Sequence, residues 1–209
     1  MKKIILFFVF FFTSFFSEGQ SFEGKITYTV SYKSKLSELS DQKWASMLGS
    51  EQDYYIKGGN YKSITNGSML EWQLYNSKEN TIYNKSKSPN GAIPIDASQQ
   101  TDVITKTEII KNAATILGYT CDEIIITTTS SVEKYFYSSK LSVDPSVFQK
   151  HKYGNWYEFV SRSKALPLKI IIDNHQFLME STATAVKEIK LKDNFFDLPA
   201  GTVVLKSQY

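Results

Sequence analysis

Cysteine and arginine are almost absent from this chain of 209 residues, which has one of each, Cys121 and Arg162. A single cysteine cannot form a disulfide bond within the chain. The planar guanidinium group is the usual partner of phosphates and guanine edges, so the scarcity of arginine argues against nucleic-acid binding. The formal net charge of +3 is also too small to attract nucleic acid or an anionic membrane in general.

Catalytic and metal-binding patterns are missing as well. His151 and His175, the only histidines, lack the paired spacing of a zinc site, and no serine lies in a Gly-x-Ser-x-Gly motif. Asp122 and Glu123 are adjacent on an expected strand, so they point to opposite faces and cannot act together as acid and base. We therefore expect no catalytic residue, no metal and no cofactor, and a protein that is not an enzyme.

The amino-terminal residues have the pattern of a secretory signal peptide. Lys2 and Lys3 precede an apolar run over residues 4–16, and the small-x-small triplet Ser17-Glu18-Gly19 follows. The apolar run is too short to span a bilayer. We predict that residues 1–19 are cleaved, which lowers the net charge from +3 to +2 through the loss of two lysines and one glutamate. Residues 20–209 then form one exported domain that does not span the membrane.

Cys121 has two interpretations in an exported protein. It lies too far along the chain to be an acylated lipoprotein cysteine, and no cysteine stands directly after the predicted cleavage site. It could be a reactive thiol, but it opens a strand-like run and free cysteine is among the most buried residue types. We expect a packing role.

Most of the chain is expected to form short antiparallel strands. Apolar and polar residues alternate over residues 22–32, as in a strand with one buried face. Gly58-Gly59 and Asn66-Gly67 are typical of tight hairpin turns and separate strands over residues 54–57, 61–65 and 69–75. Further strands are predicted over residues 81–84, 107–111, 119–128, 133–137 and 168–172, and from 176 towards 191.

Two helices and one long loop interrupt this pattern. Apolar residues at helical spacing before Gly49 predict a helix over residues 37–48, and Asp144-Pro145 is a helix start before Gly154. Residues 85–105 show little periodicity and are predicted to be a long loop. In the carboxy-terminal tail, Phe195 and Phe196 are expected to pack before a closing segment over residues 203–205.

The order of these elements and several short motifs resemble the LolA-like superfamily of envelope proteins of Gram-negative bacteria, which includes lipoprotein-sorting carriers. The motifs are Phe22-Glu23-Gly24-Lys25-Ile26, Tyr55-Ile56-Lys57-Gly58-Gly59-Asn60-Tyr61, Leu117-Gly118-Tyr119-Thr120-Cys121, Leu166-Pro167-Leu168 and Phe196-Asp197-Leu198-Pro199. Together they extend over most of residues 20–209. Arg162 does not align with the arginine that the lipoprotein carriers are thought to use, so the resemblance implies the fold more strongly than lipoprotein transfer.

The resemblance implies a mainly β fold, a strongly curved antiparallel sheet forming an incomplete half-barrel, with two or more short helices covering its concave face. It also implies a periplasmic or otherwise exported protein that holds a lipid or the acyl chain of a lipoprotein in an apolar cavity. Burial of each methylene there would contribute about 0.8 kcal/mol. The candidate lining residues are Tyr28, Val30, Trp72, Leu74, Phe136, Phe148, Trp156, Phe159, Ile170 and Ile172.

Ordinary core packing is the alternative for each of these residues, because a domain of this size needs a core. Two other functions stay open. The chain could be an envelope interaction or sensing module that recognises a protein partner and takes no small molecule, or an enzyme of unknown type. The ligand hypothesis requires that the helix-covered side of the sheet is incompletely filled.

Overall fold

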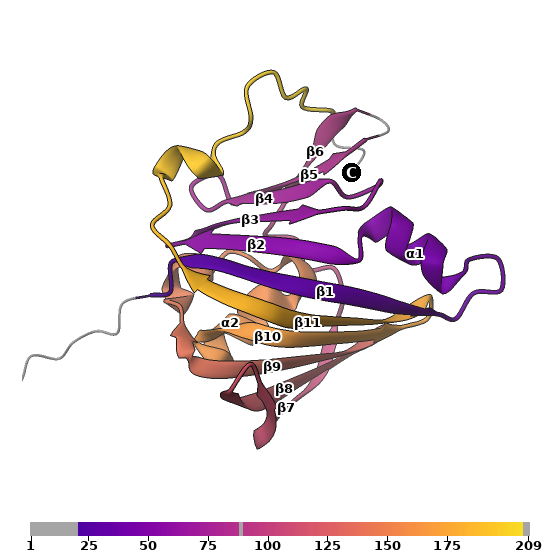
Figure 1. Ribbon diagram of the computed structural model, residues 1–209, viewed down its shortest axis with the longest axis vertical. Helices are drawn as coiled ribbons and strands as arrows, with labels where there is room; N and C mark the ends of the chain where they lie inside the picture. Colours follow the sequence, from indigo (N-terminus) through magenta and orange to yellow (C-terminus); the bar gives the residue numbers. More distant parts are fainter. Residues whose placement is uncertain (1–20, 88–89, 207–209) are drawn as a thin grey trace, which may run out of the picture.

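A single open antiparallel sheet of eleven strands dominates the computed structural model, which describes residues 21–87 and 90–206 (Figure 1). The strands lie in the order β6-β5-β4-β3-β2-β1-β11-β10-β9-β8-β7. The bounds are β1 (Gly24–Ser34), β2 (Glu51–Lys57), β3 (Asn60–Thr65), β4 (Trp72–Asn76), β5 (Thr81–Ser86), β6 (Gly91–Asp96), β7 (Ile104–Ile116), β8 (Tyr119–Thr128), β9 (Ser131–Ser142), β10 (Ala165–Asn174) and β11 (Phe177–Glu188). Two meanders therefore meet where the first strand pairs with the last.

Helical segments are few and short. Helix α1 (Asp41–Leu48) is capped by Ser40, whose Oγ accepts a hydrogen bond from the backbone N–H of Lys43. Three short 3-10 segments are η1 (Pro145–Phe148), η2 (Tyr153–Asn155) and η3 (Asp193–Phe196), and helix α2 (Trp156–Ser163) follows η2 directly. Among the described residues, no helix is both long and apolar enough to cross a bilayer.

The sheet has two faces that the register of β1 to β4 defines. One row of neighbouring residues across these strands is Gly24, Ile56, Tyr61 and Tyr75. We call this side the helix face, because Tyr61 contacts Trp156 of α2 and Tyr75 contacts Phe148 of η1. The next row, Lys25, Tyr55, Lys62 and Leu74, points to the opposite side. We call that side the tail face.

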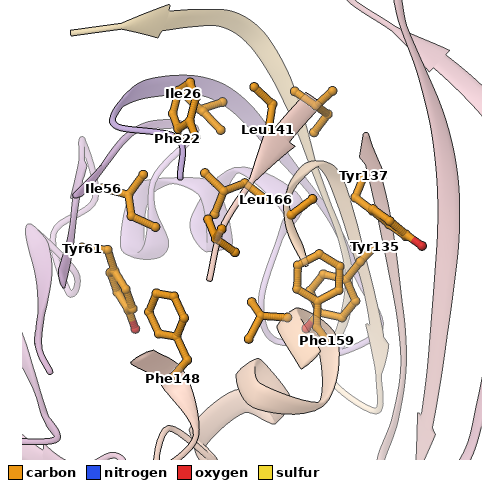
Figure 2. Packing of buried hydrophobic residues seen from close by; sticks show 14 of the residues in the cluster. Phe22, Ile26, Ile56, Tyr61, Tyr135, Tyr137, Leu141, Phe148, Phe159 and Leu166 are labelled. Atoms are coloured by element: carbon orange, nitrogen blue, oxygen red, sulfur yellow. The ribbon is translucent and has the colours of Figure 1, made fainter. Parts of the chain in front are cut away.

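The main hydrophobic core lies on the helix face. Figure 2 shows Phe159 beside Tyr135 and Phe148 towards Tyr61, and the Phe159 and Tyr135 rings stack with centroids 4.5 Å apart. Phe148, Phe159 and Ile26 are fully buried there. Trp44 of α1 donates to Ser34 Oγ, which lies on the same side of β1 as Ile26. The prediction of at least two short helices is therefore confirmed, and both pack on this side of the sheet.

A second, smaller cluster lies on the tail face. Trp72, Leu74 and Ala92 are buried there against Phe196 of the carboxy-terminal segment, residues 189–206. This segment ends beside the edge strand β6, where Ala92 forms an isolated parallel bridge with Val204 (Figure 1). The predicted packing of the tail aromatics is confirmed.

Several expectations need correction. The sheet is open, as expected of an incomplete barrel, because its end strands β6 and β7 do not pair with each other. It is not strongly curled, so the expected half-barrel curvature is wrong, whereas the coarser expectation of a mainly β antiparallel sheet is confirmed. Residues 85–105 are not one loop, since they include β6, whose Pro94 hid the strand pattern. The predicted signal peptide lies outside the described residues.

Cys121 is completely buried, as expected of a packing residue. Its thiol has a raised pKa, chiefly because burial disfavours the thiolate. Cys121 therefore lacks the exposed, low-pKa environment of a reactive cysteine.

Candidate functional site: an apolar pocket beneath Trp156

A pocket of about 160 Å³ lies on the helix face between the sheet and the start of α2. Its lining residues come from β1 to β4, from β10 and from α2: Tyr28, Gln52, Tyr54, Tyr61, Gln73, Trp156, Pro167 and Ile170. An engineered apolar cavity of similar size in another protein holds benzene. The pocket therefore has room for a small apolar group or for the apolar end of a larger molecule.

Trp156 forms one wall of the pocket, and its position is fixed by the turn that precedes it. Gly154 and Asn155 both have left-handed backbone angles, with φ of 61° and 55°, which turn the chain sharply from η2 into α2. The side chain of Asn155 donates to Glu133 Oε1 at 2.9 Å and accepts from Gln100 Nε2 at 2.8 Å. These bonds tie the start of α2 to β9 and to the segment after β6.

The carboxyl group of Glu133 is buried in this anchor. Burial raises its pKa, against the opposing effect of hydrogen bonds from Tyr135, Asn155 and Ser131. The Tyr135 hydroxyl donates to Glu133 Oε2 at 2.8 Å. The Glu133 carboxyl group, the Tyr135 hydroxyl and the Asn155 amide are therefore all hydrogen-bonded. Such a fully paired buried network favours one fixed position for Asn155 and hence for Trp156.

Aromatic rings surround the Trp156 indole. Its ring centroid lies 6.0 Å from Tyr61, 6.5 Å from Tyr54 and 6.0 Å from Phe148. His151 packs against the same indole, with centroids 6.3 Å apart, and its Nε2 lies 3.0 Å from the Tyr61 hydroxyl oxygen. Burial lowers the pKa of His151 to about 4, so its imidazole is neutral at physiological pH.

The polar atoms of the pocket residues fall into two groups. The Tyr28 hydroxyl donates to the carbonyl oxygen of Pro167 at 2.6 Å, and the Tyr61 hydroxyl is paired with His151. By contrast, Tyr54 Oη and Trp156 Nε1 are buried and have no hydrogen-bond partner among the residues that the structure describes. Desolvation raises the pKa of Tyr28, Tyr54 and Tyr61, so all three hydroxyls stay protonated at neutral pH.

The ten residues predicted to line a cavity are divided by the structure. Tyr28, Trp156 and Ile170 line the pocket. Phe148 and Phe159 belong to the adjacent core and contact Trp156. Val30 and Ile172 lie on the helix face but do not line the pocket.

Trp72 and Leu74 lie apart from the other residues, and Phe136 packs at the edge of the main core without lining the pocket. Trp72 and Leu74 lie in the cluster of the tail face. Phe136 follows Tyr135 on β9, and since Tyr135 stacks on Phe159 of the helix face, strand alternation directs Phe136 to the other side. These three cannot share one pocket with Tyr28.

Sequence reasoning missed Gln52, Tyr54, Tyr61, Gln73 and Pro167 as lining residues. The sequence could have indicated the two tyrosines. Tyr54 and Tyr61 flank the predicted Gly58-Gly59 turn, and residues on either side of a two-residue hairpin turn lie on neighbouring strands. The glutamines gave no signal, since a polar residue on a strand is usually solvated.

Two larger hollows are polar surface features. One, of about 470 Å³, is lined by residues that include Lys140, Glu188 and Lys190. The other, of about 630 Å³, includes the Lys57–Asp193 ion pair at 2.7 Å between Nζ and Oδ1. Each mixes charged residues with a few apolar ones, Phe22 and Ile189 in the first and Phe196 in the second, whereas aromatic and aliphatic residues form most of the wall beneath Trp156. Within residues 21–87 and 90–206, no group of three or more His, Cys, Asp or Glu residues could hold a metal ion.

Comparison with known proteins finds no matching family model and no matching curated protein. Among solved structures, PNGF-II in space group P21 is 14% identical, with a TM-score of 0.47 over 88% of this chain and 32% of that chain. PNGF-II in space group C2 is 15% identical, with a TM-score of 0.45, and covers 87% and 31% of the two chains. LprF from Mycobacterium bovis is 11% identical, with a TM-score of 0.35, and covers 86% and 90%. This chain spans about a third of the PNGF-II chain, and likenesses this distant carry no function over to it.

Proposed function

We propose that this chain is an exported, non-catalytic envelope protein of the LolA-like superfamily that binds a hydrophobic ligand, a lipid or the acyl chain of a lipoprotein, on its helix face. The observation that supports this most strongly is the unfilled pocket beneath Trp156. Its wall is mainly aromatic and aliphatic, and it lies under a short helix beside one continuous sheet. The signal-peptide pattern of residues 1–19 supports export, and the motifs listed above support the superfamily.

The volume of the pocket limits the size of the group that it can hold without a change in the protein. At about 160 Å³ it falls below the 300–1,000 Å³ range usual for drug-sized ligands. It accommodates the end of an acyl chain, and the remainder of the ligand lies outside. A longer buried stretch requires Trp156 and α2 to move outwards.

A titration with toluene tests the proposal, because toluene is close to the pocket in size. The indole N–H resonance of Trp156, assigned by its loss in W156F, is expected to move and saturate. The variant I170F fills the pocket and is expected to abolish this response. The variant I171F is the matched control, since Ile171 is the next residue along β10 and points to the tail face. Equal responses in I170F and the unmodified chain would contradict the proposal.

The second candidate is an envelope protein-interaction module, and the outer edge of β7 favours it. No described strand pairs with that edge, and Ile109 and Ile110 there are 44% and 45% exposed. An exposed edge with apolar residues can pair with an extended segment of another chain. The variant I109K/I110K would then lose a partner that crosslinks to β7 while keeping the toluene response, which separates the two functions.

A further inference from the structure

The two unpaired polar atoms at the pocket belong to residues on opposite sides of it. Tyr54 Oη comes from β2, and Trp156 Nε1 comes from α2, with the ring centroids 6.5 Å apart. A buried donor without an acceptor costs about 1–3 kcal/mol, and native proteins rarely leave such groups unpaired. Neither atom touches bulk solvent, so its partner is a molecule held inside the fold, either an ordered water or a ligand that replaces it.

The pocket contains no charge that could pair with an anion. Its eight lining residues include no lysine, arginine or histidine. His151 does not line the pocket but contacts Tyr61 and Trp156, and it is neutral because burial lowers its pKa to about 4. A carboxylate or phosphate in this pocket would be a buried charge without a partner, which is strongly unfavourable.

We propose that the pocket selects an apolar molecule that carries a neutral hydrogen-bond acceptor, such as a ketone or ester carbonyl, and that the Tyr54 hydroxyl and the Trp156 indole N–H are its donors. This inference rests on the proposed function and narrows it. The acceptor oxygen lies between Tyr54 of β2 and Trp156 of α2, and the apolar part lies against Ile170 and Pro167. A free fatty acid in its ionised form is excluded, whereas its ester is accepted.

Three small probes of similar shape separate polarity from size. Cyclohexanone carries the acceptor, methylenecyclohexane replaces its oxygen with a CH₂ group, and cyclohexanecarboxylate carries a negative charge. The two neutral probes differ in hydration, so their affinities for one protein are not directly comparable. The informative quantity is the change in affinity for each probe that a substitution causes. The variant Y54F is expected to weaken the binding of cyclohexanone about tenfold, which is the contribution of one hydrogen bond to a buried donor. It is expected to change the affinity for methylenecyclohexane by no more than about twofold.

The matched control is Y83F. Tyr83 lies on the tail face, where its hydroxyl donates to Glu79 Oε2 at 2.8 Å, so its loss is expected to change the affinity of neither probe. The Trp156 indole N–H gives a second readout in the unmodified chain. Its proton resonance is expected to move downfield with cyclohexanone and not with methylenecyclohexane, because only the ketone accepts its hydrogen bond.

Each other outcome has a distinct meaning. If Y54F weakens both neutral probes equally or neither of them, the acceptor proposal fails while apolar binding stands. If cyclohexanecarboxylate binds as tightly as cyclohexanone, the selection for a neutral ligand fails. If the unmodified chain binds none of the probes and also fails to respond to toluene, the proposed function itself falls.

Discussion

The helix face and the tail face are built from the same strands, yet different kinds of structure cover them. On the helix face, η1 and α2 lie over a large aromatic core and leave the pocket beneath Trp156. On the tail face, a segment with a single 3-10 turn covers Trp72, Leu74 and Ala92 with its own Phe196, and the rest of the face carries ion pairs such as Lys25–Asp53. The comparison indicates that the helix face holds most of the buried hydrophobic side chains and the apolar pocket, and that the carboxy-terminal segment covers only one end of the tail face.

Truncation of Phe159 is expected to have the largest effect on stability. Phe159 is fully buried and contacts Tyr135, Tyr137 and Trp156. Since Phe-to-Ala changes in a core remove transfer free energy and leave a cavity, F159A should lower the free energy of unfolding by about 3–5 kcal/mol. Urea denaturation measures this. A loss below about 1 kcal/mol would mean that the helix face is not the main core.

Acid should weaken the helix face through His151. Its pKa is lowered in the folded protein from 6.5 to about 4, so the unfolded chain takes up a proton first as the pH falls. The stability that neutral His151 allows is complete above pH 6.5 and is lost as the pH falls from 6.5 towards 4, by about 3 kcal/mol in total.

Comparison with H151N isolates this contribution from the carboxylates that titrate near the same pH. The variant should lose less stability than the unmodified chain between pH 7 and pH 4, whereas H175N, changed at an exposed turn, should follow the unmodified chain. If the free energy of unfolding fell equally with pH in H151N and the unmodified chain, protonation of His151 would not destabilise the folded protein.

Phe195 provides the corresponding test on the tail face. It is half-buried, contacts Tyr55 at 4.9 Å between ring centroids, and lies under Lys62 Nζ at 5.3 Å. F195A should therefore cost about 1–2 kcal/mol in urea denaturation and leave the toluene response of Trp156 unchanged. If F195A abolished that response, the two faces would be coupled and the comparison would fail.

The smallest effect is expected at the ion pair between Lys25 Nζ and Asp53 Oδ2, which are 2.7 Å apart on the tail face. The hydrogen bond to Asp53 raises the pKa of Lys25. Both side chains are partly exposed, so K25M should lower the free energy of unfolding by less than about 1 kcal/mol, and by still less at high salt. A larger loss would give the polar part of the tail face a structural role that its exposure does not predict.

Much of the fold follows from local sequence patterns. The alternation over residues 22–32 predicted β1, and the turn dipeptides at 58–59 and 66–67 placed β2, β3 and β4. Helix α2 was missed, although Trp156, Phe159 and Val160 have helical spacing, because its left-handed start at Gly154 and Asn155 is not an ordinary capping sequence.

The site was only partly predictable, for a physical reason. Alternation tells which residues of one strand share a face, but not which face that is relative to another strand; the pairing register decides this. Trp72 and Leu74 alternate as regularly as Tyr28 and Val30, yet the register places them on the other side of the sheet. Nor does sequence show whether packed rings leave a gap, since that depends on how Trp156 lies over Tyr54 and Tyr61.

The most direct test of the account is a crystal of the protein under xenon pressure, because xenon enters apolar cavities of this size without needing a specific ligand. The account predicts a xenon atom between Trp156, Tyr54 and Ile170 on the helix face, and none there in I170F. A fully packed interior at this position, with no xenon bound, would contradict the claim that this sheet keeps an apolar site open beneath α2.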